Sequence, residues 1–320
     1  MKEYSVLILG AGRIGAFFDT SESELVLTHA KAFTTHPGFC LMGFVDQDRQ
    51  QALRAASIWG GGAFVSLAEA LDGRMVDVAV VAAPDDCHYP LLKALADYPL
   101  RLVFAEKPLT ATLAQAAEIT ELYRDRGIAL ALNYSRRYVP EFEALRAEIA
   151  DRRLGRLLAG CGYYGKGTLH NGSHMIDLLR FLFGDCSLQS CIDGVHDYSS
   201  SDPSCSALLR LPGGGTFVMQ AVDCRCYTIF ELDLLFEWAR IRLTDAGFEM
   251  QRYEVKESAT FTGYFNLALA DARPTGLGAA MGHAVGQLYA HLSSGAPLCC
   301  TGLDGLRAQQ VAAAIVKGAL

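Results

Sequence analysis

Hydrophobic runs and helix-like segments alternate over roughly the first 130 residues of the chain. The run at 78–83, Val-Ala-Val-Val-Ala-Ala, is continuous, as is typical of a strand buried on both faces of a sheet. The pattern predicts strands at 4–9, 40–45, 77–83, 102–105 and 128–132, and helices at 50–59, 67–71, 88–98 and 113–125. Alternation of this kind predicts a parallel sheet with helices on its faces.

The pattern changes after about residue 133. Two helices, 140–149 and 173–183, precede a series of strands without helices between them, at 188–195, 204–211, 216–222, 229–236 and 239–243. The turn Pro212-Gly213-Gly214-Gly215 favours antiparallel pairing. The second part is therefore expected to be α+β, with an open, largely antiparallel sheet, helices on one face and a final helix at 305–317.

Composition narrows the function classes. The chain has 320 residues, 51% of them hydrophobic and 20% charged, with a formal net charge of -7. An acidic chain without Lys/Arg runs is not expected to bind nucleic acid. Its apolar stretches are far shorter than the roughly 18 residues that span a bilayer, so no membrane partner is expected. The chain enters its first strand without a secretory signal, which favours a cytoplasmic location.

The segment Gly10-Ala11-Gly12-Arg13-Ile14-Gly15 matches G-x-G-x-x-G directly after the first strand, where a helix is expected to open. In such loops the first glycine permits a tight turn, the second lets the backbone approach a pyrophosphate, and the third allows close packing of helix and strand. The phosphates then lie at the positive end of the helix. The loop therefore predicts a dinucleotide site.

Asp46 follows the second predicted strand and supports this interpretation. It lies 31 positions beyond Gly15 (46 less 15), whereas the usual separation is about 20 residues. The excess predicts an insertion, and the polar stretch 19–24 is its expected place. A carboxylate here would accept hydrogen bonds from the ribose hydroxyls and repel a 2′-phosphate, which favours NAD. NADP is the alternative, because Arg49 could accommodate the phosphate. The competing interpretation of Asp46 is a surface acid at a strand end.

Together with these motifs, several further segments resemble the Gfo/Idh/MocA (glucose-fructose oxidoreductase, inositol dehydrogenase) family of pyridine-nucleotide enzymes, over essentially the whole chain. The segments are Ala83-Pro84-Asp85-Asp86-Cys87-His88, Glu106-Lys107-Pro108, 133–138, 170–177 and 301–308. The resemblance implies an α/β fold with a Rossmann-type dinucleotide-binding domain at 1–131. It implies a substrate-binding and oligomerisation domain at 132–320, whose last helix packs near the first domain.

Lys107 follows the strand at 102–105, at the carboxyl edge of the sheet where open α/β folds hold ligands. By resemblance it is the catalytic lysine and also contacts cofactor and substrate, Pro108 has a cis peptide bond, and Glu106 lies near the nicotinamide ribose. Without the resemblance, a lysine at a strand end would be interpreted as a solvated charge. The other residues implied to bind the cofactor are Arg13, Ile14, Ala83, Pro84, His88 and Asn133.

His174 resembles the family's second catalytic residue, a base for the hydroxyl that is oxidised, and imidazole suits this because its unperturbed pKa is about 6.5. The family usually places Asp four residues earlier, where this chain has His170. His170 either binds substrate or relays the proton, or the orienting role has passed elsewhere, with Asp177 as a candidate on the same helix face. A metal bound by His170 and His174 is not expected, because the Glu of H-E-x-x-H is absent.

Two further residues are candidate substrate ligands. Arg136, or its neighbour Arg137, could bind a carboxylate or phosphate in a bidentate manner, although one of them could instead pair with an acid. The ring of Tyr164 suits a sugar but could equally pack in the core.

The resemblance implies reversible hydride transfer between NAD(P) and a secondary alcohol of a sugar, cyclitol or nucleotide-linked sugar. The alternatives are an NAD-dependent redox glycosidase and a non-catalytic dinucleotide-binding regulator. A sugar-like substrate and a homo-oligomer, either dimer or tetramer, are expected.

Overall fold

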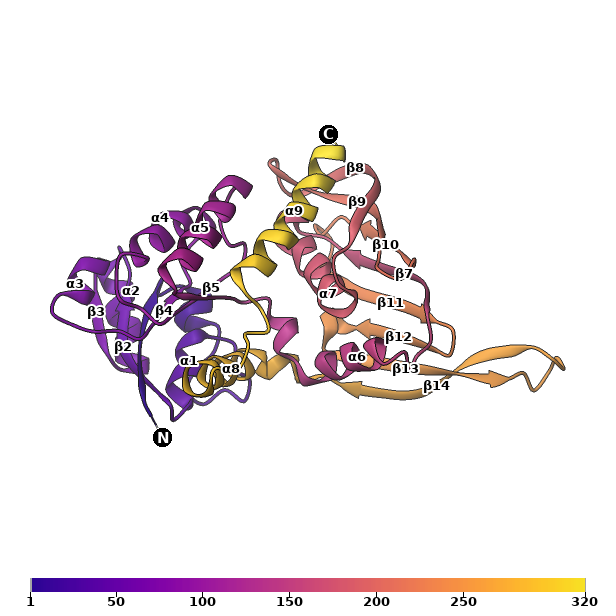
Figure 1. Cartoon of the computed structure of the whole chain (residues 1–320), viewed down its shortest axis with the longest axis horizontal. Helices are drawn as coiled ribbons and strands as arrows, with labels where there is room; N and C mark the ends of the chain where they lie inside the picture. The colour runs from indigo at the N-terminus through magenta and orange to yellow at the C-terminus, as the bar shows by residue number, and fades with distance from the viewer. Residues whose placement is uncertain (1, 320) are drawn as a thin grey trace. The chain divides into compact units, whose positions relative to one another are not determined.

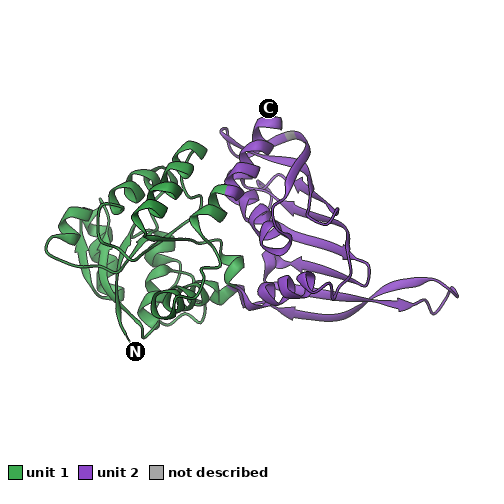
Figure 2. Ribbon diagram, viewed as in Figure 1, with its two compact units in different colours: residues 1–138, 278–306 green, residues 139–277, 307–320 purple. Residues whose placement is uncertain are grey.

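The chain divides into two compact units (Figure 2). The computed structural model describes residues 2–319, without the side chain of Asp193. Unit 1 consists of residues 1–138 and 278–306, and unit 2 of residues 139–277 and 307–320. Residues 132–138 and 278–306 therefore group with the first unit, whereas the sequence placed them in the second domain. The assignment of cofactor and substrate binding to separate units is still a prediction.

Unit 1 contains a six-stranded sheet in the order β3-β2-β1-β4-β5-β6, and every strand pair in it is parallel. The strands are β1 Tyr4–Leu9, β2 Phe39–Val45, β3 Gly62–Phe64, β4 Val78–Val81, β5 Leu102–Ala105 and β6 Ala129–Leu132. All residues of β4 and β5 are buried, as their continuous apolar sequences predict. This is the predicted doubly wound parallel sheet.

Helices lie on both faces of this sheet, with α4 and α5 on one side and α1 and α8 on the other (Figure 1). The helices of unit 1 are α1 His29–Thr35, α2 Arg49–Trp59, α3 Leu67–Leu71, α4 Asp85–Leu95, α5 Leu113–Arg126 and α8 Ala280–Ser294. Thr28, Asp48, Ser66 and Thr112 each cap a helix by accepting from its free backbone N–H groups. A 3-10 turn, η2 Ser135–Tyr138, precedes unit 2.

Unit 2 contains an eight-stranded sheet in the order β14-β13-β12-β11-β7-β10-β9-β8. The strands are β7 Leu157–Tyr164, β8 Ser187–Ser199, β9 Asp202–Arg210, β10 Thr216–Ala221, β11 Phe230–Phe236, β12 Ala239–Thr244, β13 Glu249–Glu257 and β14 Phe265–Pro274. Only the β7–β10 pair is parallel. The expectation of an open, largely antiparallel sheet is confirmed.

The helices α6 Pro140–Ala150 and α7 Ser173–Phe183 cover one face of this sheet (Figure 1). Buried residues alternate with partly exposed ones along β11 and β12, as expected for a sheet with one covered face. The last helix, α9 Gly302–Ala319, begins in unit 1 and ends in unit 2.

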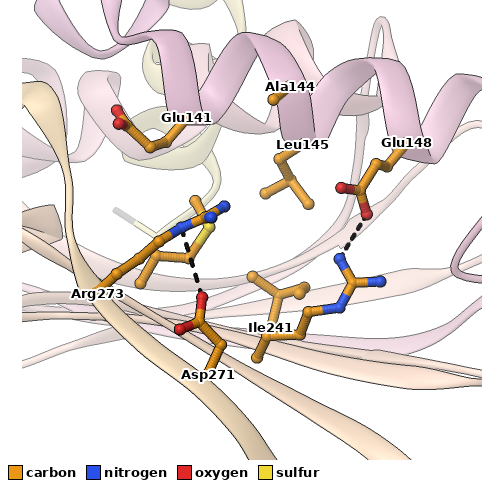
Figure 3. Close-up of a pocket in the computed structure, with 9 residues that line it drawn as sticks. Glu141, Ala144, Leu145, Glu148, Ile241, Asp271 and Arg273 are labelled. Atoms are coloured by element: carbon orange, nitrogen blue, oxygen red, sulfur yellow. Dashed lines mark hydrogen bonds and ion pairs between the residues drawn. The ribbon is translucent and has the colours of Figure 1, made fainter.

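A crevice between α6 and strands β12–β14 is nearly filled by charged side chains (Figure 3). Glu148 Oε2 lies 2.6 Å from Arg252 Nη1, and Asp271 pairs with Arg273 at 3.6 Å. The free volume is about 20 Å³, room for little more than one water molecule. The ion pair between Glu148 and Arg252 therefore attaches α6 to the sheet, and the space that remains is too small for a substrate.

Candidate dinucleotide site

The glycine loop has the geometry that each of its glycines was predicted to provide. Gly10 has φ +100°, and a Cβ there would lie 2.5 Å from the carbonyl oxygen of Ala82. A Cβ on Gly15 would lie 2.1 Å from the carbonyl oxygen of Gly10. A Cβ on Gly12 would meet no protein atom within 4 Å, so this backbone borders open space that a pyrophosphate can approach. The residues present therefore fit a dinucleotide.

The expectation of a regular helix opening at the glycine loop is wrong. Only a five-residue π-helical turn, η1 Arg13–Phe17, follows the loop, and α1 begins at His29. Asp19 is buried and organises the intervening residues 18–28, because its Oδ1 accepts from Thr28 Oγ1 at 2.6 Å and its Oδ2 from Thr28 N at 3.0 Å. This segment contains the insertion predicted from the long spacing to Asp46. So short a turn adds little of the helix dipole that was expected to favour the phosphates.

Asp46 lies at the mouth of the glycine loop. Its Oδ2 accepts from Ala11 N at 2.9 Å and its Oδ1 from Asp48 N at 3.0 Å, which fixes the carboxylate beside the loop. It lines a cavity of about 560 Å³ together with Gly10, Gly12 and Pro84. The predicted residues Ala83 and Pro84 also line this cavity, whereas the sequence did not identify the apolar lining residues Val65, Leu67, Cys87, Pro90 and Leu91 as part of the site.

Arg49, Arg13 and Ile14 do not line this cavity. Arg49 extends toward Glu69 at 3.8 Å, and Arg13 is exposed, with its guanidinium over the ring of Phe18 at 5.8 Å. A 2′-phosphate beside Asp46 would therefore meet a carboxylate and no guanidinium from Arg49, which supports NAD over NADP.

Predicted site residues follow successive strands at the carboxyl edge of the sheet. Backbone hydrogen bonds extend the ladder beyond the strands, from Ala82 N to Leu9 O, Glu106 N to Val81 O and Asn133 N to Ala105 O. The residues after β1, β4, β5 and β6 are thereby held in register, so Lys107 lies on the same edge as the glycine loop. Its peptide bond to Pro108 is cis, as the resemblance implied.

His88 requires a correction. Its side chain is fully buried, with Nδ1 2.7 Å from Pro108 O and Nε2 2.9 Å from Ala83 O. The imidazole therefore joins the loops after β4 and β5, and direct contact with a cofactor is not compatible with its burial.

Glu106 lies in a small buried cluster. Its Oε1 accepts from Asn133 Nδ2 at 2.7 Å and lies 2.8 Å from His29 Nε2. Burial acts to raise the pKa of Glu106, but the hydrogen bond and charge of His29, then Asn133 and the nearby Lys107, lower it overall. No local pattern in the sequence indicates the contact of His29 with a residue 77 positions away.

In unit 2, His170 and His174 lie in consecutive short elements. His170 belongs to a π-helical segment, η3 Gly167–Gly172, and His174 to the first turn of α7. Asp202 fixes the segment, since its Oδ1 accepts from Leu169 N at 2.8 Å and its Oδ2 from His170 N at 2.9 Å. The ring of His170 stacks on Tyr198, with centroids 4.7 Å apart.

The two aspartates beneath this segment differ in pKa. Burial raises the pKa of Asp202, and its hydrogen bonds offset only part of that effect. Burial also acts to raise the pKa of Asp197, but hydrogen bonds from Lys166 N, Ser204 and Cys224 lower it overall. Both carboxylates bind backbone N–H groups around the histidine segment. Asp177, the other candidate to orient His174, is buried in α7.

The prediction that Tyr164 binds substrate also requires a correction. Its side chain is fully buried, and its hydroxyl lies 2.6 Å from Cys205 O and 2.9 Å from Thr168 Oγ1. The phenol is therefore part of the core, which was the alternative to substrate binding. Burial also raises its pKa.

The two neighbouring arginines, Arg136 and Arg137, differ in burial and in their partners. Arg137 is buried, and its Nη1 donates to Cys299 O at 2.9 Å and pairs with Asp304 at 3.2 Å. Arg136 is partly exposed, and desolvation lowers the pKa of its guanidinium to about 10, so it stays charged at neutral pH. Arg136 therefore keeps its place as the candidate anion ligand.

Within residues 2–319, no three or more His, Cys, Asp and Glu side chains are arranged to hold a metal ion. The helices described in the same range include none with the length and apolar character needed to cross a membrane.

Comparisons with known proteins show which proteins the chain is similar to. Residues 4–134 match a family model described as oxidoreductase family, NAD-binding Rossmann fold. The inositol 2-dehydrogenase of Rhizobium meliloti (strain 1021) is 25% identical over 335 residues, covering 97% of this chain and 95% of the relative.

Solved structures share the fold. An NAD-binding oxidoreductase from Klebsiella pneumoniae is 16% identical with a TM-score of 0.81, and the alignment covers 99% of this chain and 96% of that chain. The WlbA dehydrogenase from Bordetella pertussis, solved in complex with NADH and UDP-GlcNAcA, is 16% identical with a TM-score of 0.76 and covers 99% and 97%. The N-terminal part of the chain, residues 4–134, therefore matches the Gfo/Idh/MocA oxidoreductase family model with its NAD-binding Rossmann fold, and nearly the whole chain is similar to an inositol 2-dehydrogenase.

Proposed function

We propose that the protein catalyses reversible hydride transfer between NAD and a secondary alcohol of a sugar, a cyclitol or a nucleotide-linked sugar. The observation that carries the proposal is the shared carboxyl edge in unit 1. There the glycine loop, Asp46 and Lys107 follow strands of one parallel sheet, which is the edge where open α/β folds bind ligands.

In this proposal the backbone at Gly12 lets the pyrophosphate approach the loop, and the carboxylate of Asp46 accepts hydrogen bonds from the hydroxyls of the adenosine ribose. Bound NAD supplies the hydride chemistry, while the protein supplies position and electrostatics. Glu106 and Asn133 are expected near the nicotinamide ribose, because both follow strands at the same edge. Arg13 and Ile14 remain candidate contacts through their place in the loop.

Lys107 and His174 would manage the proton of the substrate hydroxyl. The Lys107 ammonium donates a hydrogen bond to the reacting oxygen, which stabilises negative charge there, and the His174 imidazole removes the proton during oxidation. In the reverse direction the imidazolium returns it. His170 and Arg136 are proposed substrate ligands, and the bonds from Asp202 keep the His170 backbone in place.

A substrate panel tests the proposal. NADH formation is measured with neutral sugars, cyclitols, sugar phosphates and sugar nucleotides, with NAD and with NADP, for the wild type and Lys107→Met. We expect turnover with at least one class, and a loss of about 100- to 10,000-fold in Lys107→Met with nearly unchanged NAD affinity. An undiminished rate in the variant would remove the role of Lys107. Glycoside cleavage without net NADH would favour the glycosidase, and NAD binding without any turnover the regulator.

We also propose a homo-oligomer, formed through the sheet face of unit 2 opposite α6 and α7. The strand register places Val255 opposite Leu267 and Tyr253 opposite Leu269 on that face. Leu269 is 54% exposed, and Tyr163 and Val218 on the same face are also exposed. On this face the ion-paired Asp233, Arg240 and Arg242 of β11 and β12 lie between the apolar residues of β13–β14 and those of β7 and β10. Such a mixture of exposed apolar and charged side chains is compatible with an interface between copies of the chain. Light scattering after size exclusion should give a dimer or tetramer for the wild type and a smaller species for Leu269→Asp; a monomeric wild type would refute the interface.

A further inference from the structure

A buried imidazole lies behind the edge that carries Lys107. His29 begins α1 and has no exposed surface. Its ring packs edge-on against Phe104 of β5, with centroids 5.2 Å apart, and its Nε2 lies 2.8 Å from Glu106 Oε1. An ionisable side chain from the first helix therefore contacts the residue that precedes Lys107.

The hydrogen-bond roles in this cluster follow from the chemistry of the carboxylate. An ionised carboxylate only accepts, so Nε2 of His29 must carry the proton that it shares with Glu106. Asn133 Nδ2 donates to the same oxygen at 2.7 Å. Among the described residues, Nδ1 of His29 has no hydrogen-bond partner. His29 therefore acts on Glu106 as a hydrogen-bond donor through Nε2.

The charges around Glu106 come from few groups. His29 approaches it from α1 and Lys107 from the loop after β5, whereas Asn133, which follows β6, is uncharged and also contacts Met281 of α8. Burial acts to raise the pKa of the carboxyl, and the hydrogen bond from His29 is the largest opposing influence on it. Without His29, the Glu106 carboxylate would become protonated at a higher pH. The Lys107 ammonium would then lose the nearby negative charge that stabilises it.

The 18–28 segment holds His29 in place. Thr28 Oγ1 caps α1 by accepting from Lys31 N at 3.1 Å, and Asp19 binds both the backbone N–H and the hydroxyl of Thr28. The 18–28 segment is thereby connected to Glu106 through one residue, His29.

We propose that His29 is a positioning residue, which holds the Glu106 carboxylate in place beside Lys107 and is itself held by the 18–28 segment. The proposal rests on the proposed function only in its effect on turnover. Its effect on Glu106 is measurable without a substrate.

The test compares His29→Leu, which removes the donor, with His29→Gln, whose amide can reach the same oxygen. Infrared titration follows the carbonyl stretch of a protonated carboxyl, and the same variants carrying Glu106→Gln assign the band. We expect Glu106 to protonate at higher pH in His29→Leu than in the wild type, with His29→Gln in between. If His29→Leu does not fold, His29→Asn, whose amide is too short, takes its place.

Turnover gives the second measurement. In His29→Leu, kcat is expected to fall about ten- to a hundredfold, the cost of losing a hydrogen bond to a buried charged group, and its acidic limb is expected to move to higher pH. His29→Gln should recover most of kcat. The control Phe33→Leu, at a buried position of the same helix, should lower stability without moving either pH profile.

An unchanged Glu106 titration in His29→Leu would overturn the proposal, as would equal losses in the Leu and Gln variants. If the wild type turns over no substrate but the infrared titration moves as expected, the role of His29 stands and the proposed reaction fails.

Discussion

Substitution of Gly12 by Ala separates cofactor binding from folding. A Cβ at this position meets no protein atom within 4 Å, and the backbone has φ −84°, which alanine adopts readily. The variant is therefore expected to fold as well as the wild type. Its methyl group would occupy the space through which the pyrophosphate approaches the loop.

The two effects have different expected magnitudes. Replacing glycine by alanine at a compatible position stabilises a protein by about 0.4–1 kcal/mol, a rise of about 2–4 °C per kcal/mol in Tm for a unit of this size. Loss of one hydrogen bond to a phosphate costs about 1.5–3 kcal/mol, which raises the Kd for NAD about ten- to a hundredfold.

Calorimetric titration with NAD and thermal unfolding measure these quantities on one preparation. Gly15→Ala is the contrasting variant, because its Cβ would lie 2.1 Å from the Gly10 carbonyl oxygen, and it should lower Tm. Gly286→Ala in α8, where a Cβ also meets nothing within 4 Å, is the matched control and should not affect NAD binding. Wild-type NAD affinity in Gly12→Ala, or a Tm several degrees lower, would refute the reasoning.

Three further predictions concern single carboxylates. Asp46→Ala should weaken NAD binding about tenfold or more, the value of a hydrogen bond to a charged group, and affect NADP much less, as paired titrations would measure; equal losses would argue against ribose recognition. Asp202→Asn should destabilise unit 2 by about 1–3 kcal/mol and speed hydrogen exchange at the amides of Leu169 and His170, whereas unchanged protection there would contradict its anchoring role. Because the pKa of Glu106 is lowered on folding, its ionised form adds stability above the unfolded pKa, and this is lost as the pH falls through the folded value. The Tm difference between the wild type and Glu106→Gln should therefore shrink on acidification, and a constant difference would disprove the coupling.

The sequence predicted the elements that have strong periodicity. The buried strands β4 and β5 are continuous apolar runs, β1 is apolar except for Ser5, and α7 ends at Phe183, before Gly184, as predicted. The strands β13 and β14 were not predicted: they are largely exposed and rich in charged residues, and the short alternation at Phe265, Leu267 and Leu269 was not recognised as a strand. The helix α8 was also missed, since it contains Gly282 and Gly286, which have low helix propensity.

Candidate site residues could be nominated from the sequence where each one directly follows a strand. Gly12, Asp46 and Lys107 each follow a strand, so local pattern was sufficient to nominate them. His29 and His88 act through contacts with residues far away in the sequence, or through backbone carbonyls, and such contacts leave no local pattern. Tyr164 was ambiguous because an aromatic residue near a strand end suits both a core and a sugar site.

The central claim is that a hydride moves from a substrate carbon to NAD beside Lys107 and His174. A substrate identified by the panel and deuterated at its carbinol carbon tests this most directly, in a single turnover analysed by mass spectrometry of the nucleotide. The account predicts that the deuterium is recovered on the nicotinamide ring of NADH, and that Lys107→Met forms this product far more slowly. Conversion of the substrate with the label released to water, or with NAD left unlabelled, would contradict it.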